Sequence, residues 1–513
     1  MEIFRLKTLR IKDNDIFQKE IEFNLSQVSD SFSVNAPYLT LILGANGTGK
    51  SNLLKFIIDV FRLAYDKLNE IVSITYPNGK YYLEYQLGNS NYIILNTLGW
   101  EYANEPPKYL RDKKSEKGIR FFKDGKEIPD SKIKIPDSIL ALSIMLTDKY
   151  LFLRNPSNYS IYKYLGVRRD SNTAGTRSLI GKTIENVFAA SERKEFIDSL
   201  SEMLSFLELE NDFRISYSPK YKQHFFLPDL TLTKFENFFL DNKKYLPNRT
   251  TEPWSVSAFK QLKKTEPEII PQLVELLKYL SGKLENLENS RAQYFEFNIF
   301  DIQPGFKKLF TLLPYLHGLN IISYPEITLK KSRYYGIGES SSGEYHFIST
   351  IVGLLATIKD NSIVLIDEPE ISLHPNWQMK YIAFLNKVFK KYNSVHFVIC
   401  SHSHFLVSDL KPENSTIISL KLDEEISATT IDANTYGWSA EEVLYSVFNV
   451  RSTRNSFLEY DLTKLVTLVN RNSKEYGEIK RIIEKISTLV LSESDPLKIL
   501  KEKAEKYLEK NNA

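Results

Sequence analysis

Cysteine is almost absent from this sequence, with Cys400 the single example among 513 residues. One thiol excludes an internal disulfide and a zinc site built from several cysteines. Cys400 lies in the apolar run SVHFVIC, so we expect a small buried core residue. The sequence also lacks an apolar run near the roughly 20 residues of a membrane helix. Its first residues lack the apolar core of a signal peptide, so we expect a cytoplasmic protein without membrane contact.

A strong excess of one charge is missing too, since 67 basic and 64 acidic residues leave a formal net charge of +3. That balance excludes a polycation that coats nucleic acid, but it leaves room for a local basic patch. Residues 110–126, LRDKKSEKGIRFFKDGK, are basic. Two interpretations stay open for them, a solvated hairpin and a contact with DNA or RNA.

The stretch LILGANGTGKSNLL, residues 41–54, matches the phosphate-loop consensus GxxxxGK[ST]. It lies between an apolar strand and a segment with helical spacing, which is the context that such a loop requires. We expect Lys50 to reach the β- and γ-phosphates and the Ser51 hydroxyl to bind Mg²⁺. The expected ATP-binding residues are Gly44, Ala45, Asn46, Gly47, Thr48, Gly49, Lys50, Ser51 and Asn52.

A phosphate loop needs acidic side chains at the end of another buried strand, and SIVLIDEPE, residues 362–370, supplies them. Asp367 is expected to hold Mg²⁺ through its water shell, and Glu368 to orient or deprotonate the attacking water. Lys50 and Asp367 are 317 residues apart, which is too far for one compact core. The sequence therefore predicts an insertion between the two halves of the site.

Two further polar segments accompany the acidic strand. In GIGESSSGEYHF, Ser341 or Ser342 can cap a helix with help from Glu344, or the helix can bind a second anion. Since Lys50 already holds the γ-phosphate, a second anion site would serve the nucleotide of a partner subunit. His402 follows the next apolar strand, where a polar side chain can sense the γ-phosphate.

Other polar residues near these strands have weaker predictions. His404 is expected to be a surface or loop histidine. Glu370, Ser372 and His374 have either an interface role or a role in a turn.

The predicted fold is α/β, with a mixed sheet and phosphate-loop core plus an inserted α-helical domain. Prolines cut the helical patterns of residues 179–320 into short pieces, which excludes a long coiled coil. The expected domains are a first ATPase lobe at 1–150, the helical insertion at 151–320, a second lobe at 321–450 and a helical segment at 451–513.

The order of these motifs resembles ABC-type ATPases, in the branch of SMC, RecF and OLD-like proteins. In that resemblance SSSGE is the signature motif, comprising Ser341, Ser342, Gly343 and Glu344, although a glycine is usual at position 342. The resemblance implies ATP and Mg²⁺ as ligands and catalytic roles for Lys50, Glu368 and His402. It also implies a homodimer or higher homo-oligomer, in which each ATP lies between one phosphate loop and the partner's signature serine.

The family's Q-loop glutamine has no counterpart in SILALSIMLTDKY, so Ser143 and Asp148 are the candidate replacements.

Within the branch, three segments resemble stand-alone anti-phage ATPases such as the PtuA subunit of Septu systems. They are SILALSIMLTDKY, YKYLGVR and TYGWSAEEVLYSVFNV. That resemblance implies a separate nuclease effector as partner, of the HNH type in Septu. About 63 residues follow position 450 without a metal-ligand cluster, so we do not expect nuclease activity in this chain. Two alternatives stay open: a compact DNA-repair ATPase that binds DNA with ATP, and an ATP-bridged scaffold with little turnover.

Overall fold

The chain forms two compact units, Met1–Trp438 and Ser439–Ala513, in a computed structural model. We describe each unit by itself. The described residues are 3–27, 36–71, 77–96, 119–145, 147–151, 161–170, 173–174, 176–241, 253–286, 293–302, 310–371, 373–407, 409–422, 424–431, 435, 437–438, 442–444, 456–489 and 496–510.

The core of the first unit is a seven-stranded sheet in the order β20-β19-β3-β18-β17-β8-β9. All neighbouring strands are parallel except β19 and β20, so the expected mixed sheet is confirmed. Its central strands are continuous apolar runs because both of their faces are covered. The strands are β3 (Tyr38–Gly44), β8 (Ser138–Ser143), β9 (Tyr162–Tyr164), β17 (Ser362–Asp367), β18 (His396–Ser401), β19 (Ser415–Leu422) and β20 (Ile426–Thr430).

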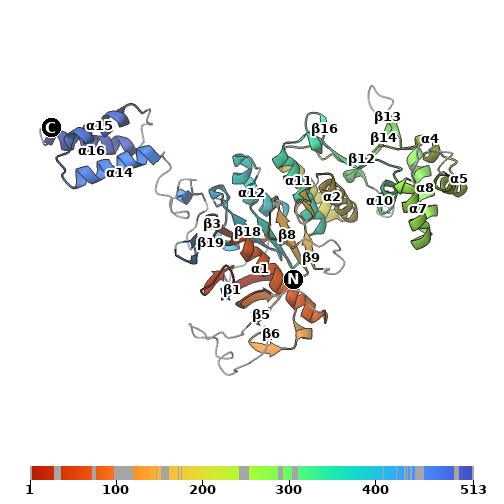
Figure 1. The fold of residues 1–513 in the computed structure, drawn as a ribbon, viewed down its shortest axis with the longest axis horizontal. Helices are drawn as coiled ribbons and strands as arrows, with labels where there is room; N and C mark the ends of the chain where they lie inside the picture. Colours follow the sequence, from red (N-terminus) through yellow and green to blue (C-terminus); the bar gives the residue numbers. More distant parts are fainter. Residues whose placement is uncertain are drawn as a thin grey trace. The chain divides into compact units, whose positions relative to one another are not determined.

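Helix α1 (Lys50–Leu68) covers one face of this sheet and separates it from a second, antiparallel sheet (Figure 1). Buried apolar side chains from α1 and both sheets form one continuous core. Four of its six strands come from residues 80–96 and 119–128. Its order is β2-β1-β4-β5-β6-β7, with β1 (Phe4–Lys12), β2 (Ile21–Asn24), β4 (Lys80–Leu87), β5 (Ser90–Asn96), β6 (Ile119–Lys123) and β7 (Lys126–Ile128).

The opposite face of the central sheet carries α11 (Ser342–Thr357) and α12 (Pro375–Val388) (Figure 1). Two helices of the insertion, α2 (Thr176–Ala190) and α3 (Lys194–Phe206), pack against them. The Ser199 hydroxyl on α3 donates to the Val388 carbonyl at the end of α12, 3.1 Å away. The insertion is therefore joined to the layer that covers the ATPase sheet.

The insertion holds helices, as the sequence predicts, and also a five-stranded sheet that the helical patterns did not indicate. Every pair in the order β13-β14-β12-β15-β16 is antiparallel. Its strands are β12 (Phe213–Tyr217), β13 (Glu285–Asn286), β14 (Gln293–Asn298), β15 (Glu326–Lys330) and β16 (Tyr334–Gly336). The helices are α4 (Lys222–Phe225), α5 (Leu232–Leu240), α7 (Trp254–Thr265), α8 (Ile269–Ser281) and α10 (Leu313–Gly318), and a short ribbon joins β10 (Arg168–Asp170) to β11 (Thr173–Ala174).

The second unit contains α14 (Ser456–Asn470), α15 (Tyr476–Ser487) and α16 (Pro496–Lys510). Apolar side chains from all three helices form a core of their own. Asp461 on α14 is paired with Lys485 on α15 at 2.5 Å. Across the described parts of both units, we find no helix with the length and apolar character needed to cross a membrane.

Candidate nucleotide-binding and catalytic site

The candidate site lies at the carboxyl edge of the central sheet. Asp367, the last residue of β17, is level with Cys400 on β18 and with Ser143 on β8. Cys400 is in turn level with Ile42 on β3, two residues before the phosphate loop. Parallel strands in register therefore bring the loop and the acidic residues to one edge, where ligands of such sheets bind.

Glycine is required at three positions of the phosphate loop, Gly44–Gly49. Gly47 and Gly49 have φ angles of 84° and 85°, in the left-handed region that favours glycine. A Cβ atom on Gly44 would lie 2.8 Å from both the Leu420 carbonyl oxygen and the Thr48 hydroxyl oxygen. The loop thus combines two left-handed residues with a close approach of β19, and the sequence motif reflects both constraints.

The side chain of Lys50 folds back over the loop that precedes it. Its ammonium group donates to the carbonyl oxygens of Gly44 and Ala45 at 2.8 and 3.2 Å. The residue is 4% exposed, and burial lowers the pKa of its amine. A buried cation held above exposed loop backbone at Ala45–Gly47 is suited to an incoming phosphate.

Asp367 has the properties of a metal-binding carboxylate. Its residue is 1% exposed, and neither carboxylate oxygen accepts a hydrogen bond of regular geometry from a described residue. Burial raises the pKa of Asp367 to about 6, and the nearby Ser51 hydroxyl opposes that rise. A buried carboxylate without donors, next to a hydroxyl, offers the hard oxygen ligands that Mg²⁺ prefers. These residues therefore fit the predicted metal.

Glu368 and His402 meet beside Lys50. The Nε2 atom of His402 lies 3.0 Å from Glu368 Oε1 and 2.8 Å from Lys50 Nζ. The contact with His402 is the main reason that the pKa of Glu368 is lowered. One nitrogen cannot donate to the carboxylate and accept from the ammonium at once, so we assign the Nε2 proton to the Glu368 contact. The ammonium then donates to the loop carbonyls.

The backbone at Glu368 is unusual. This residue follows β17 with a φ angle of 49°, a left-handed conformation that is uncommon for a side chain other than glycine or asparagine. Its amide still donates to the Cys400 carbonyl at 2.9 Å, which extends the pairing of β17 with β18 by one residue. Strained backbone of this kind is concentrated at functional sites, where surrounding contacts enforce it.

Glu370 supports His402. The sequence had left two interpretations open for Glu370, a role at an interface and a role in a turn. Its Oε1 atom accepts a hydrogen bond from the His402 backbone amide at 2.6 Å. Burial raises the pKa of Glu370, and Oε2 is buried without a hydrogen-bond partner among the described residues. The signal in the sequence was the spacing in DEPE. Glu370 comes only two residues after Glu368, so both glutamates lie near the end of the same strand.

The signature residues lie apart from this cluster in the same chain. Ser341 caps α11, and its hydroxyl accepts from the Glu344 amide at 3.2 Å, so the predicted cap is present. The Glu344 carboxylate accepts from the Tyr335 hydroxyl at 3.1 Å. Ser341 and Ser342 are exposed and Gly343 is buried. No hydrogen bond or ion pair among the described residues joins these four residues to the phosphate loop.

The two candidate replacements for the Q-loop glutamine differ in their surroundings. The Arg168 guanidinium donates two hydrogen bonds to the Asp148 carboxylate, at 2.9 and 2.6 Å. The Tyr164 hydroxyl donates to the same carboxylate at 2.7 Å. Asp148 is thus saturated by protein donors. Ser143 is level with Asp367 in the sheet and accepts only from the Met145 amide in the described part of the chain, at 3.1 Å. Ser143 is the better placed of the two.

The remaining polar residues make contacts that stabilise local structure. His374 caps α12, because its Nδ1 atom accepts from the Asn376 amide at 3.3 Å. The His404 ring contacts the Phe405 ring with centroids 4.0 Å apart and planes 38° apart, and burial lowers the pKa of His404. Ser372 lies outside the described residues. Two neighbours that sequence reasoning missed are Ile16 and Phe17, which pack closely against the Cα of Gly49.

Known proteins are similar to parts of this chain. A family model described as AAA ATPase domain matches residues 19–407. Septu protein PtuA from Bacillus thuringiensis is 26% identical over 143 residues, which are 27% of this chain and 34% of PtuA. Protein ea59 from Escherichia phage lambda is 27% identical over 117 residues, 23% of this chain and 22% of ea59. The chain thus matches about a third or less of either relative, and the expected resemblance to PtuA is confirmed over that part.

Two SMC head structures also show weak similarity to this chain. The SMC head domain from Thermotoga maritima is 12% identical, with a TM-score of 0.34 over 84% of this chain and 100% of that one. The Smc head domain from Pyrococcus furiosus, bound to the C-terminal domain of ScpA, is 14% identical with a TM-score of 0.31 over 88% and 100%. At such low TM-scores the likeness adds nothing to the assignment. The AAA ATPase model, however, spans the phosphate loop, the acidic strand and His402, so the chain belongs to the AAA ATPase domain family.

Proposed function

We propose that the chain binds ATP with Mg²⁺ at this edge of the sheet and hydrolyses it through Lys50, Glu368 and His402. The observation that carries the proposal is the convergence of these three side chains within 3.0 Å contacts, from segments more than 300 residues apart. Family membership supports the ATPase activity. The individual roles rest on the geometry.

Each side chain has a distinct task in the proposed reaction. Lys50 is released from the loop carbonyls to stabilise the negative charge of the transferring phosphate. Glu368 is ionised at neutral pH, because the His402 contact lowers its pKa, and can therefore accept a proton from the attacking water. His402, held by Glu370, donates to Glu368 and keeps the carboxylate in place. Mg²⁺ held by Ser51 and Asp367 would neutralise charge on the phosphate oxygens.

We further propose that two copies enclose two ATP molecules. Support comes from the start of α11, where Ser341 and Ser342 are exposed and no hydrogen bond or ion pair among the described residues joins them to the catalytic cluster. A helix N-terminus attracts anions through its free amides and its dipole. A two-fold arrangement that places this terminus on the partner's γ-phosphate would bury both sites at once. Hydrolysis would then weaken the dimer.

The proposed biological role is control of a separate nuclease effector in defence against phage. The support is the local match to Septu protein PtuA, which spans about a third of that relative. The ATPase would convert nucleotide state into a dimer state that the effector senses. An HNH-type nuclease is the proposed partner by that resemblance.

Substitution Glu368→Gln tests the central proposal. Because the carboxamide cannot accept the water proton, turnover should fall by at least about 100-fold while ATP binding persists. The mass of the particle, measured by light scattering with ATP and Mg²⁺, should then shift to that of a dimer. Lys50→Ala should remain monomeric under the same conditions. A Glu368→Gln chain that binds ATP yet stays monomeric would overturn the two-copy arrangement.

A further inference from the structure

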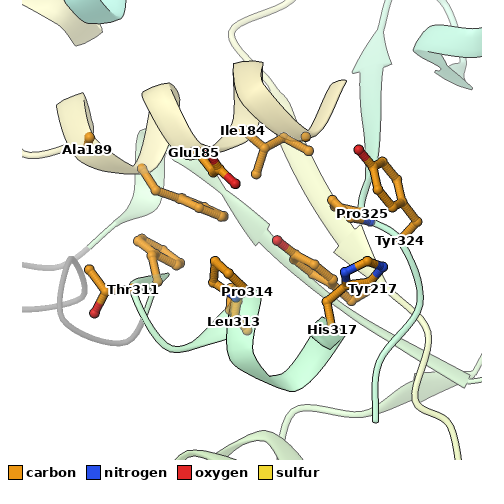
Figure 2. A pocket seen from close by; sticks show the side chains of 13 residues that line it. Ile184, Glu185, Ala189, Tyr217, Thr311, Leu313, Pro314, His317, Tyr324 and Pro325 are labelled. Carbon is orange, nitrogen blue, oxygen red and sulfur yellow. The ribbon is translucent and has the colours of Figure 1, made fainter. Parts of the chain in front are cut away.

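A second candidate site lies in the insertion, between α2, β12 and α10 (Figure 2). It is a cavity of about 370 Å³, a size typical of small-molecule sites. One face of α2 forms a wall, with lining residues three or four positions apart as on one helix stripe. These residues are Gly181, Ile184, Glu185, Phe188 and Ala189.

Aromatic rings give this cavity flat and firm walls. Phe188 on α2 stacks on Phe310 with centroids 3.8 Å apart and ring planes 10° apart. Tyr217 on β12 is buried and stacks on Phe295, with centroids 5.5 Å apart. Such stacked pairs hold their orientation, and their faces carry partial negative charge. A planar apolar ring fits between walls of this kind.

The polar side chains that line the cavity include one carboxylate, that of Glu185, besides hydroxyl groups and an imidazole. Figure 2 shows that the Glu185 carboxylate and the Tyr217 hydroxyl point into the same space from opposite sides. Glu185 is the one lining side chain with a full charge in the described part of the chain. Burial lowers the pKa of His317, which keeps that lining imidazole neutral at pH 7. Nearby Lys220 donates instead to Asn320 at 2.6 Å.

We propose that this cavity binds a small organic cation with a flat apolar ring, whose ammonium group pairs with Glu185. The ring lies against Phe188 and Tyr217, and the cation faces the carboxylate and the aromatic faces. The carboxylate and the aromatic faces favour a cationic ligand, and in the described lining no side chain carries a full positive charge.

The same helix connects this cavity to the middle and the C-terminal end of α11, the helix at whose start the signature residues lie. The Thr183 hydroxyl on α2 donates to the Ser349 carbonyl on α11 at 3.4 Å. Beyond the end of α2, Arg193 donates to the Ala356 carbonyl of α11 at 2.5 Å. A ligand bound against α2 therefore contacts a helix that is hydrogen-bonded to α11, and Ser341 is the N-cap of α11. We infer that occupancy of the cavity changes ATP turnover, and this step rests on the proposed function.

Calorimetric titration of the full chain with tryptamine tests the binding. Tryptamine carries a flat ring and an ammonium group, and 3-indolepropionate carries a similar ring with a carboxylate. Wild type should bind tryptamine saturably and 3-indolepropionate at least about tenfold more weakly, because Glu185 repels the acid. Glu185→Gln should lose about tenfold in tryptamine affinity, and Ala189→Phe should abolish binding by filling the cavity. Glu195→Gln, a matched change on an exposed glutamate of α3, should bind as wild type does.

Different outcomes test the binding site, the effect of binding on ATP turnover, and the proposed ATPase function. Equal tryptamine affinity in wild type, Glu185→Gln and Ala189→Phe, or no binding at all, would overturn the site. Tryptamine should change phosphate release by wild type saturably and leave Glu185→Gln unaffected at the same concentrations. Binding without any change in turnover would overturn the coupling. Lys50→Ala should bind tryptamine normally but release no phosphate, and turnover by that variant would contradict the proposed function without touching the cavity.

Discussion

Lys50 shows how a single residue depends on distant parts of the chain. Its ammonium contacts loop carbonyls five and six residues back and His402 from a different strand. The same burial that lowers its pKa also strengthens its attraction for a phosphate, because water cannot screen a charge in that position. No other described side chain touches both the loop and the Glu368–His402 pair.

Lys50→Ala should therefore lower ATP turnover by at least about 100-fold, the effect expected for losing a preorganised charge at the transition state. Phosphate release at saturating ATP measures it. Lys55→Ala is the matched control, because Lys55 lies on the same helix and pairs with Asp59 at the surface. Turnover that survives Lys50→Ala would contradict the assignment of the whole site.

His396 is a second residue with a defined contribution, although the sequence did not single it out. It is fully buried on β18, where Nδ1 accepts from the Leu6 amide at 3.0 Å and Nε2 lies 2.7 Å from the Thr40 hydroxyl. It thereby joins the antiparallel sheet to the central sheet. Burial lowers the pKa of His396 well below the ordinary 6.5, so the folded chain keeps it neutral.

This neutral histidine makes stability depend on pH. His396 binds a proton near pH 6.5 in the unfolded chain but stays neutral in the folded chain. Its contribution to the free energy of unfolding is therefore complete above pH 6.5 and is lost as the pH falls. Between pH 7.5 and 5.5, the free energy of unfolding should drop by about 1.4 kcal/mol more in wild type than in His396→Gln. Urea unfolding followed by tryptophan fluorescence measures it. Parallel pH profiles for the two chains would refute the prediction.

At the scale of elements, α11 connects the insertion to the proposed partner site. Its carbonyls accept from Thr183 and Arg193 on the insertion side, and its N-terminus is capped by Ser341. The helix is buried along most of its length, yet its first residue, Ser342, is exposed together with the cap, Ser341. An end that is exposed on a buried helix is consistent with contact to another molecule.

Substitution Ser341→Asp keeps a capping side chain at the N-terminus of α11 but adds a negative charge there. It therefore tests the effect of charge separately from the effect of capping. Aspartate caps helices as well as serine does, so the melting temperature should stay within experimental error. Its negative charge would repel the partner's γ-phosphate, and turnover should fall at least about tenfold. Thr231→Asp is the control, because Thr231 caps α5 in the same manner, accepting from the Lys234 amide. If both variants retain full turnover, α11 does not touch a nucleotide.

At the scale of the whole molecule, the chain divides into a large unit with the candidate site and a small helical unit. The small unit has its own apolar core, so it does not need the site to fold. Its surface exposes Phe457 and Tyr460 on α14. This division favours a separate task for the small unit, such as contact with the proposed effector.

A chain that ends at Trp438 should therefore keep ATP turnover within about twofold of the full chain, since the described site residues all lie before that point. It should no longer copurify with the proposed nuclease effector. Both properties are measured in one preparation, by phosphate release and by the mass of the purified complex. Retained copurification would assign the contact to the large unit instead.

The convergence of the candidate site residues was predictable from the sequence because its parts obey local rules. A glycine-rich turn between strand and helix, an apolar run ending in Asp367 and Glu368, and a polar residue after the next strand each show in a short window of sequence. Parallel strands must end at one edge, so their joint location followed from the pattern. The α/β fold class and the buried state of Cys400 followed in the same way.

Tertiary structure alone decided the contacts that cross long stretches of chain. Glu370 holding the His402 amide, Arg168 occupying Asp148, and His396 joining two sheets all depend on side-chain directions that no local pattern specifies. The five-stranded sheet of the insertion was missed because its short strands pair across intervening helices, and its non-local partners outweigh weak local signals. The cavity beside α2 has the same origin, since its walls come from segments over 100 residues apart.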